Sequence, residues 1–179
     1  ANEFIVNQTT AGNQSAPSIA ANPDGSLVIA WQSAAQDGNG DAIVARQYNA
    51  AGTPLAAEFI VNQFTTGNQS NPSVATHPTA GFVIAWQSAA QDGNLDAIVA
   101  RNYSSAGIDL GNEFVVNSFT TGAQNNPAVV IDPQGDFTVA WQSPGQETGG
   151  GTSLGALVRL YHVANDAPIM QQIPNQVSD

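Results

Sequence analysis

The stretch PSIAANPDGSLVIAWQS, residues 17–33, has the pattern of two β-strands joined by a tight turn. Asn22, Pro23 and Gly25 supply the turn, because proline presets φ while glycine and asparagine tolerate positive φ. Closely similar stretches recur at residues 72–88 and 127–143, each 55 residues further along the chain. Such a period predicts an array of equal structural units.

Four strands are predicted in each unit, and no helical period is present. In the first unit they span residues 3–7, 18–21, 27–32 and 42–48. The runs SLVIAWQS, GFVIAWQS and DFTVAWQS are apolar at consecutive positions, which indicates that both faces of each sheet are covered. We therefore expect an all-β fold of three four-stranded repeats that stack as β-propeller-like blades.

Three blades are too few to close a propeller ring alone, because propellers usually have four to eight blades. The fold therefore has an alternative. A β-trefoil or β-prism with threefold pseudosymmetry is the alternative fold. For a propeller, we expect self-association through open strand edges, in which two chains form six blades and residues 3–7 complete the partner's third blade. The domain spans residues 1–162, with repeats at about 3–57, 58–112 and 113–162. Residues 163–179 form an extended tail, whose segment 169–177 is also a candidate for strand addition to another subunit.

Charge and composition exclude several classes of function. The chain has 179 residues, three arginines, no lysine, no cysteine and a net charge of −11. Nucleic acids and anionic membrane surfaces require basic clusters, so neither partner is expected. No apolar run is long enough for membrane insertion, and the first ten residues lack the features of a signal peptide. Disulfides and thiolate metal sites are excluded.

Three kinds of residue recur once per unit and are expected to be structural. The tryptophans are interpreted as core anchors rather than as sugar-stacking platforms, since each lies in an apolar strand. Each glutamate is expected to pair with an arginine of its unit across adjacent strands. These residues are Trp31, Trp86 and Trp141; Glu3, Glu58 and Glu113; and Arg46, Arg101 and Arg159.

A polar loop near the middle of each of the first two units is a candidate site for Ca²⁺. Its oxygen-bearing side chains alternate, as calcium loops require. The alternative is a solvated β-turn, because the loop lacks a closing carboxylate and the third unit has lost the pattern. The residues are Asp37, Asn39 and Asp41 in the first unit and Asp92, Asn94 and Asp96 in the second.

The connections at residues 9–15, 65–70 and 120–125 are rich in Asn, Gln, Ser and Thr and are uncharged. Their side chains could hydrogen-bond a glycan, and the alternative is that they are ordinary connecting loops. No known nucleophile, zinc or phosphate-binding motif occurs. The three glutamates are repeat equivalents, whereas a glycosidase needs two carboxylates in different environments at one site. The chain is therefore not expected to be an enzyme.

The segments PSIAANPDGSLVIAWQS, QDGNGDAIVARQYNAAGTPL and EFIVN resemble a tandem repeat of large secreted or surface-attached bacterial RTX-type adhesins. The resemblance implies an extracellular or cell-surface, non-catalytic, adhesin-like structural or interaction module. A lectin-like carbohydrate-binding module that uses calcium is the alternative. The tail resembles the start of a cadherin-like domain through Asn165, Asp166 and Pro168, and this implies a second weak calcium site at Asn165 and Asp166.

Overall fold

The computed structural model describes residues 3–146, 153–163 and 170–172, which form three antiparallel sheets. The first sheet contains β1 (Gln14–Ala21), β2 (Leu27–Ala34), β3 (Asp41–Tyr48) and β4 (Phe59–Ile60). The second contains β5 (Gln69–His77), β6 (Gly81–Ala89), β7 (Asp96–Tyr103) and β8 (Phe114–Val115). The third contains β9 (Asn125–Ile131), β10 (Phe137–Pro144), β11 (Leu154–Val163) and β12 (Met170–Gln172). No helix capable of crossing a membrane occurs in these ranges.

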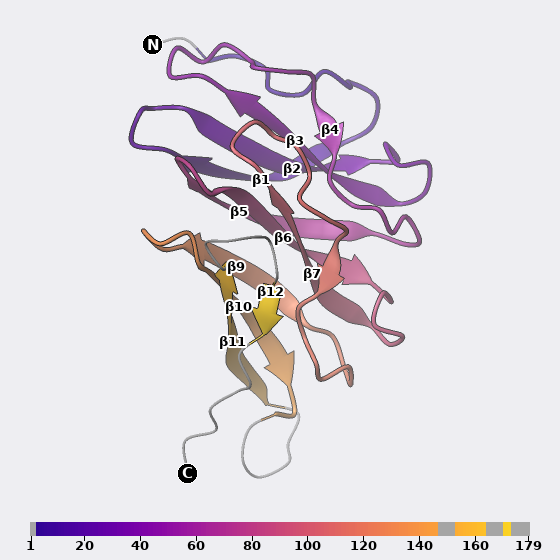
Figure 1. The fold of residues 1–179 in the computed structure, drawn as a ribbon. Coiled ribbons are helices and arrows are strands. Elements are labelled where there is room, and N and C mark those ends of the chain that lie inside the picture. Colours follow the sequence, from indigo (N-terminus) through magenta and orange to yellow (C-terminus); the bar gives the residue numbers. More distant parts are fainter. Residues whose placement is uncertain (1–2, 147–152, 164–169, 173–179) are drawn as a thin grey trace.

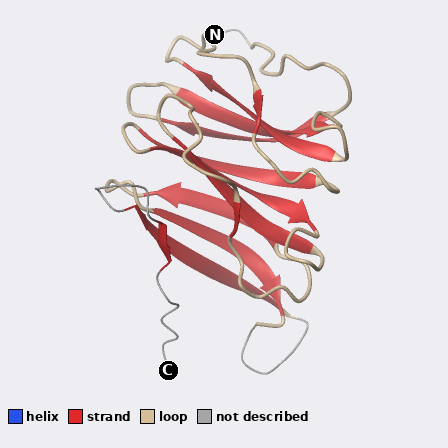
Figure 2. Ribbon diagram, turned by 45° about the vertical axis from the view of Figure 1, so that its right-hand side comes forward, coloured by secondary structure: helices blue, strands red, loops and turns tan. Residues whose placement is uncertain are grey.

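The three sheets, here called blades 1 to 3, follow one another in sequence order (Figures 1 and 2). Within each blade the strands pair in chain order, from β1 to β4, from β5 to β8 and from β9 to β12. The first strand of each blade contacts the first strand of the next, β1 against β5 and β5 against β9. These three strands are therefore the inner strands, and the predicted division into three four-stranded units is confirmed.

The outer strands differ from the prediction. β4 and β8 have only two residues each, because the chain pairs with the third strand briefly and then turns toward the next blade. Residues 3–7, predicted as a strand, have no strand pairing in the described structure. In the tail, β12 pairs with β11 at Tyr161, His162 and Val163.

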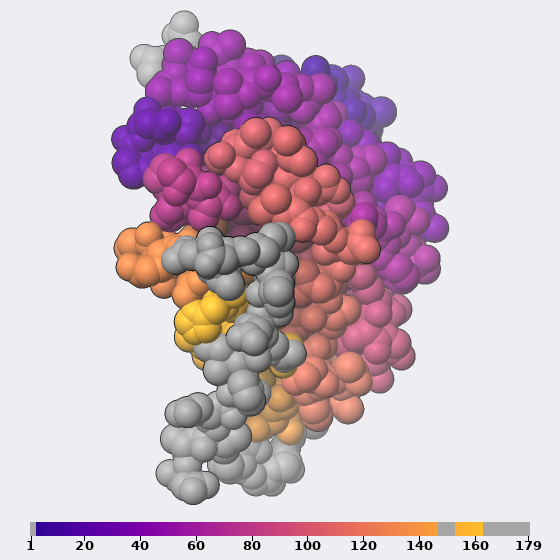
Figure 3. All heavy atoms as spheres, viewed as in Figure 1, coloured from indigo at the N-terminus to yellow at the C-terminus, as the bar shows by residue number. Residues whose placement is uncertain are grey.

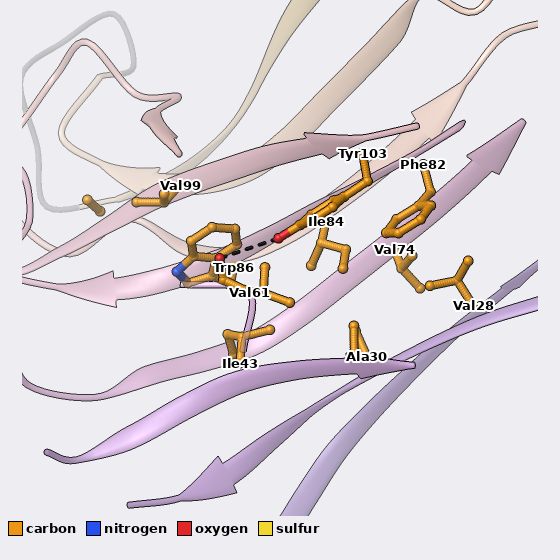
Figure 4. Packing of buried hydrophobic residues seen from close by; sticks show 12 residues of the cluster. Val28, Ala30, Ile43, Val61, Val74, Phe82, Ile84, Trp86, Val99 and Tyr103 are labelled. Carbon is orange, nitrogen blue, oxygen red and sulfur yellow. Dashed lines mark hydrogen bonds between the residues drawn. The ribbon is translucent and has the colours of Figure 1, made fainter. Parts of the chain in front are cut away.

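Adjacent blades bury their apolar residues against each other. In Figure 4, Val28 and Ile43 of blade 1 face Phe82, Trp86 and Tyr103 of blade 2. A second cluster joins blades 2 and 3 in the same way. Both sides of the middle sheet are thereby covered, which explains the unbroken apolar run of β6, whose first eight residues are all buried.

Candidate functional site

Polar side chains gather where the inner strands of blades 2 and 3 begin. We call this group the axial polar cluster and define it as Asn71, Gln87, Asp96, Asn125 and Asn126. β5 and β9 supply the three asparagines, while Gln87 lies near the end of β6 and Asp96 begins β7. The cluster therefore joins two neighbouring blades at one end of the inner strands.

Irregular pairing directs two of these side chains. The register of β5 against β6 shifts between Ser70 and Ser73, and that of β9 against β10 shifts at the corresponding place. Asn71 and Asn126 have left-handed backbones there, with φ of 51° and 54°. Asparagine adopts this conformation more readily than most residues, and a bulge turns its side chain away from the regular alternation of the strand.

Gln87 holds the cluster together. Its side-chain oxygen accepts hydrogen bonds from Asn71 Nδ2 at 2.7 Å and from the backbone N–H of Asn126 at 3.0 Å. Its side-chain nitrogen donates to Asn125 Oδ1 at 3.0 Å and to Asp96 Oδ2 at 3.4 Å. Gln87 is only 5% exposed, so these bonds fix the orientation of the more accessible groups around it.

The accessible part of the cluster offers both donors and acceptors. Asn71 and Asn126 are exposed, and Asn125 and Asp96 are half-buried. Carboxamides donate and accept, and a carboxylate accepts, so the set matches ligands that carry many hydroxyl groups. The sequence pattern gave a partial signal, since glutamine follows every repeated tryptophan, but it did not show that Gln87 reaches the next blade.

The predicted calcium residues are bonded within the protein. Asp37 accepts hydrogen bonds from the backbone N–H of Asn39 at 3.1 Å and from Asn62 Nδ2 at 2.8 Å. Asp41 instead accepts from Gln32 Nε2 at 2.6 Å. The second unit repeats these contacts at Asp92, Asn94 and Asp96. The described ranges hold no group of three or more His, Asp or Glu suited to a metal ion. Asn165 and Asp166 lie outside those ranges, and calcium binding stays a prediction.

The repeated glutamates and arginines join successive blades, and the expected Glu–Arg pairing is wrong for blades 1 and 2. The Glu113 carboxylate accepts the backbone N–H groups of Gln63 and Phe64, in the connection from β4 of blade 1 to β5. Arg101 donates to the backbone oxygen of Val61, which directly follows β4, and forms an ion pair with Asp109 at 2.7 Å. Glu58 and Arg46 make equivalent bonds to residues 6, 8 and 9, and Arg159 donates to Val116 O.

The repeated tryptophans lie in the interior. Trp31, Trp86 and Trp141 are no more than 5% exposed. Trp31 and Trp86 each donate their indole N–H to the glutamine that begins the inner strand of the same blade, Gln14 at 2.9 Å and Gln69 at 3.1 Å. Their ring faces are therefore closed to a sugar.

Comparison with known proteins finds solved structures with a similar fold. No family model matches the sequence, and no curated protein matches it. A thermostable family-43 glycoside hydrolase has a TM-score of 0.57 and 10% identity, over 96% of this chain and 61% of that chain. An endo-arabinase from Bacteroides thetaiotaomicron has a TM-score of 0.54 and 13% identity, over 90% of this chain and 58% of that chain. An endo-1,4-β-xylanase from the same organism has a TM-score of 0.53 and 9% identity, over 92% of this chain and 60% of that chain.

These similarities confirm the β-propeller-like fold and remove the trefoil and prism alternatives. They contradict the expectation of a non-catalytic adhesin-like or lectin-like module, and that of a protein without enzymatic activity, because all three structures are glycoside hydrolases. At 9–13% identity the likeness establishes the fold alone. This chain spans about 60% of the length of those three proteins and has an all-β, β-propeller-like fold similar to theirs.

Proposed function

We propose that this chain supplies three blades of a propeller that acts on polysaccharide, with the axial polar cluster as its substrate-binding surface. The observation that carries the proposal is the arrangement around Gln87, which orients Asn71, Asn125 and Asp96 at the start of the inner strands. Sugar hydroxyls donate and accept hydrogen bonds, and fixed polar groups at one place provide the specificity of a binding site.

The substrates to test first are polymers of arabinose and xylose. The fold is similar to that of an endo-arabinase and of an endo-1,4-β-xylanase, and this supports pentose polysaccharides as the substrate class. Charge is consistent with a neutral ligand, because a net charge of −11 disfavours acidic polymers.

Asp96 is our candidate for one carboxyl group of the reaction. Glycosidases use two, about 5–5.5 Å apart in retaining enzymes and about 6.5–9.5 Å apart in inverting ones. Gln87 donates to one oxygen of Asp96 and so orients the carboxylate within the cluster. We assign the second carboxyl group to the blades that complete the ring around these three.

Calorimetric titration with arabinan and xylan oligosaccharides tests the proposal. We expect wild-type protein to bind at least one of them, and Asn126→Ala and Asp96→Asn to weaken binding several-fold, since each removes or alters a hydrogen-bonding group. Gln134→Ala is the matched control, because Gln134 is exposed in the turn at the other end of β9. Absence of binding to both oligosaccharides, or equal weakening by Gln134→Ala, would contradict the proposal.

Release of reducing ends is measured with the same variants. We expect any cleavage by the wild type to be lost in Asp96→Asn while the control retains it. Cleavage that survives Asp96→Asn unchanged would exclude Asp96 as the reacting carboxylate.

A further inference from the structure

The two faces of each blade differ, and successive blades join unlike faces. Phe82, Ile84 and Trp86 point from β6 toward blade 1, while Val83 and Ala85 point toward blade 3. This interface forms twice in the chain, between blades 1 and 2 and between blades 2 and 3. Blade 1 and blade 3 lie at opposite ends of the stack (Figures 1 and 3), so each has one face that no described blade covers.

Residues that are buried at the internal interfaces have exposed equivalents on the two end faces. Each end face therefore corresponds to one side of the internal interface. Ile19 of blade 1 is 63% exposed, whereas its equivalents Val74 and Val129 are 7% exposed against the preceding blade. At the other end, Val158 of blade 3 is 52% exposed, whereas its equivalent Ala100 is fully buried. The end faces therefore continue an interface that is already established inside the chain.

The first residues of the chain lie against blade 1 in the position that the end of blade 1's outer strand takes against blade 2. The backbone oxygen of Val6 accepts from Arg46, as that of Val61 accepts from Arg101. Asn7 Nδ2 donates to the oxygen of Thr9, as Asn62 Nδ2 donates to that of Phe64. The sequence EFIVN of residues 3–7 is identical to that of residues 58–62.

One contact of this segment is missing in the described structure. Asn62 Oδ1 accepts the backbone N–H of Ile43, and Asn117 Oδ1 accepts that of Ile98, both in buried positions. No donor to Asn7 Oδ1 occurs among the described residues. The repeat equivalent of Ile43 is Ala156 of β11, at the far end of the chain.

We propose that the first blade of a second copy of this chain docks on blade 3, with residues 3–7 of that copy pairing with β11. The internal register specifies the contacts. Phe59 lies opposite Ala45 and Ile60 opposite Val44, so Phe4 lies opposite Val158 and Ile5 opposite Leu157. Among the described residues, β12 pairs with β11 at residues 161–163, whereas the proposed pairing uses Leu157 and Val158.

The proposed interface between two copies is weaker than the internal interfaces. Ser18 and Ser73 each accept the backbone N–H of the next inner strand, from Val74 and Val129. Blade 3 has Ala128 at this position, so one hydrogen bond is lost, at a cost of about 1 kcal/mol in a typical case. We therefore expect reversible association that depends on protein concentration.

Disulfide trapping tests the register, because the chain has no cysteine of its own. Phe4→Cys protein is mixed with size-tagged Val158→Cys protein under mild oxidation. Opposite residues on paired strands have Cβ atoms about 4.5–5.5 Å apart, close to disulfide range, so we expect a mixed dimer that reductant dissolves. Phe4→Cys mixed with Ile108→Cys is the control, since Ile108 is exposed on the middle blade. Equal trapping with the control would overturn the proposal.

Light scattering over a range of concentrations provides the second measurement. We expect the mass to rise from 18.4 kDa toward twice that value, and Val158→Asp to raise the concentration for half-association at least about tenfold, because a charge would be buried without a partner. Ile108→Asp should leave it unchanged. A mass that stays at that of one chain at every concentration would overturn the proposal, whether or not oligosaccharide binds.

Discussion

The side-chain oxygen of Gln69 accepts the indole N–H of Trp86 at 3.1 Å, and both side chains are fully buried. Blade 3 places Gln124 and Trp141 in the same two positions, but there neither Trp141 Nε1 nor Gln124 Oε1 has a hydrogen-bond partner in the described structure. Two equivalent pairs of one chain thus differ in whether the buried indole is satisfied.

This difference predicts unequal costs for the same substitution. Gln69→Leu leaves the indole N–H of Trp86 buried and unpaired, so we expect it to lower the free energy of unfolding by about 1–3 kcal/mol. Gln124→Leu creates no new unpaired indole and should cost less. Urea unfolding of the two variants and the wild type measures both values, and equal losses would contradict the assignment.

Acid should weaken the contact between blade 1 and the first residues of the chain. Burial alone would raise the pKa of Glu58, but hydrogen bonds from the Thr9 side chain, from the backbone N–H groups of Gln8 and Thr9, and from Gln36 outweigh it and lower the pKa. At pH values around the folded and unfolded pKa of Glu58, the folded state therefore binds fewer protons than the unfolded state. The resulting stabilisation is present above the unfolded pKa of about 4.3 and is lost as the pH falls through the folded pKa.

Melting temperatures between neutral and acidic pH test this contribution. Glu58→Gln is expected to melt earlier than the wild type at pH 7 and to lose less stability on acidification. Glu3→Gln is the matched control, because Glu3 is exposed. If Glu58→Gln and the wild type lose stability in parallel, the carboxylate does not carry the effect.

Alkaline titration should reveal a late tyrosine. Burial raises the pKa of Tyr103 to about 12, although the Arg101 guanidinium partly opposes the shift. Because the folded pKa lies above the unfolded value of about 10, the stabilising contribution is complete below pH 10 and is lost as the pH rises toward 12. Phenolate absorbance should show a step near pH 12 that Tyr103→Phe removes. Ionisation of all tyrosines near pH 10 in the folded protein would contradict this burial.

Salt should strengthen association between copies. Each chain carries a net charge of −11, so two copies repel each other at low ionic strength. Ions screen this repulsion with a Debye length of about 10 Å at 0.1 M, while the apolar contacts at Ile19 and Val158 are not weakened. Sedimentation at low and high sodium chloride should show tighter association at high salt. Weaker association at high salt would indicate a joint dominated by charge pairs.

The repeat allowed much of the fold to be predicted, because a 55-residue period with proline, glycine and tryptophan at fixed places leaves few ways to build a unit. The length of the outer strands was not predictable. β4 ends at Ile60, and the next two residues, Val61 and Asn62, make other contacts with neighbouring strands, which the sequence pattern does not show. Sequence spacing also could not show that Glu113 contacts the connection between β4 and β5, because that contact depends on how two sheets stack.

The candidate site was harder to predict for the same reason. Asn71 and Asn126 directly follow the polar loops at residues 65–70 and 120–125, and no sequence pattern singled them out. Their left-handed backbones depend on bulges that the pattern does not reveal. Gln87 follows a tryptophan in a strand, and its four hydrogen bonds cross to a neighbouring strand and blade. Sequence alone placed these polar groups in separate segments, and the stacking of blades brings them together.

The most direct measurement is a ¹⁵N NMR titration with xylan and arabinan oligosaccharides that follows the side-chain amide signals. We expect the signals of Asn71, Asn125 and Asn126 to shift in a saturable way. The signal of Gln47, which donates to Ser105 O away from the cluster, should stay in place. Saturable shifts at Gln47 with unmoved cluster signals, or no shift with either sugar, would contradict a polysaccharide site at the start of the inner strands.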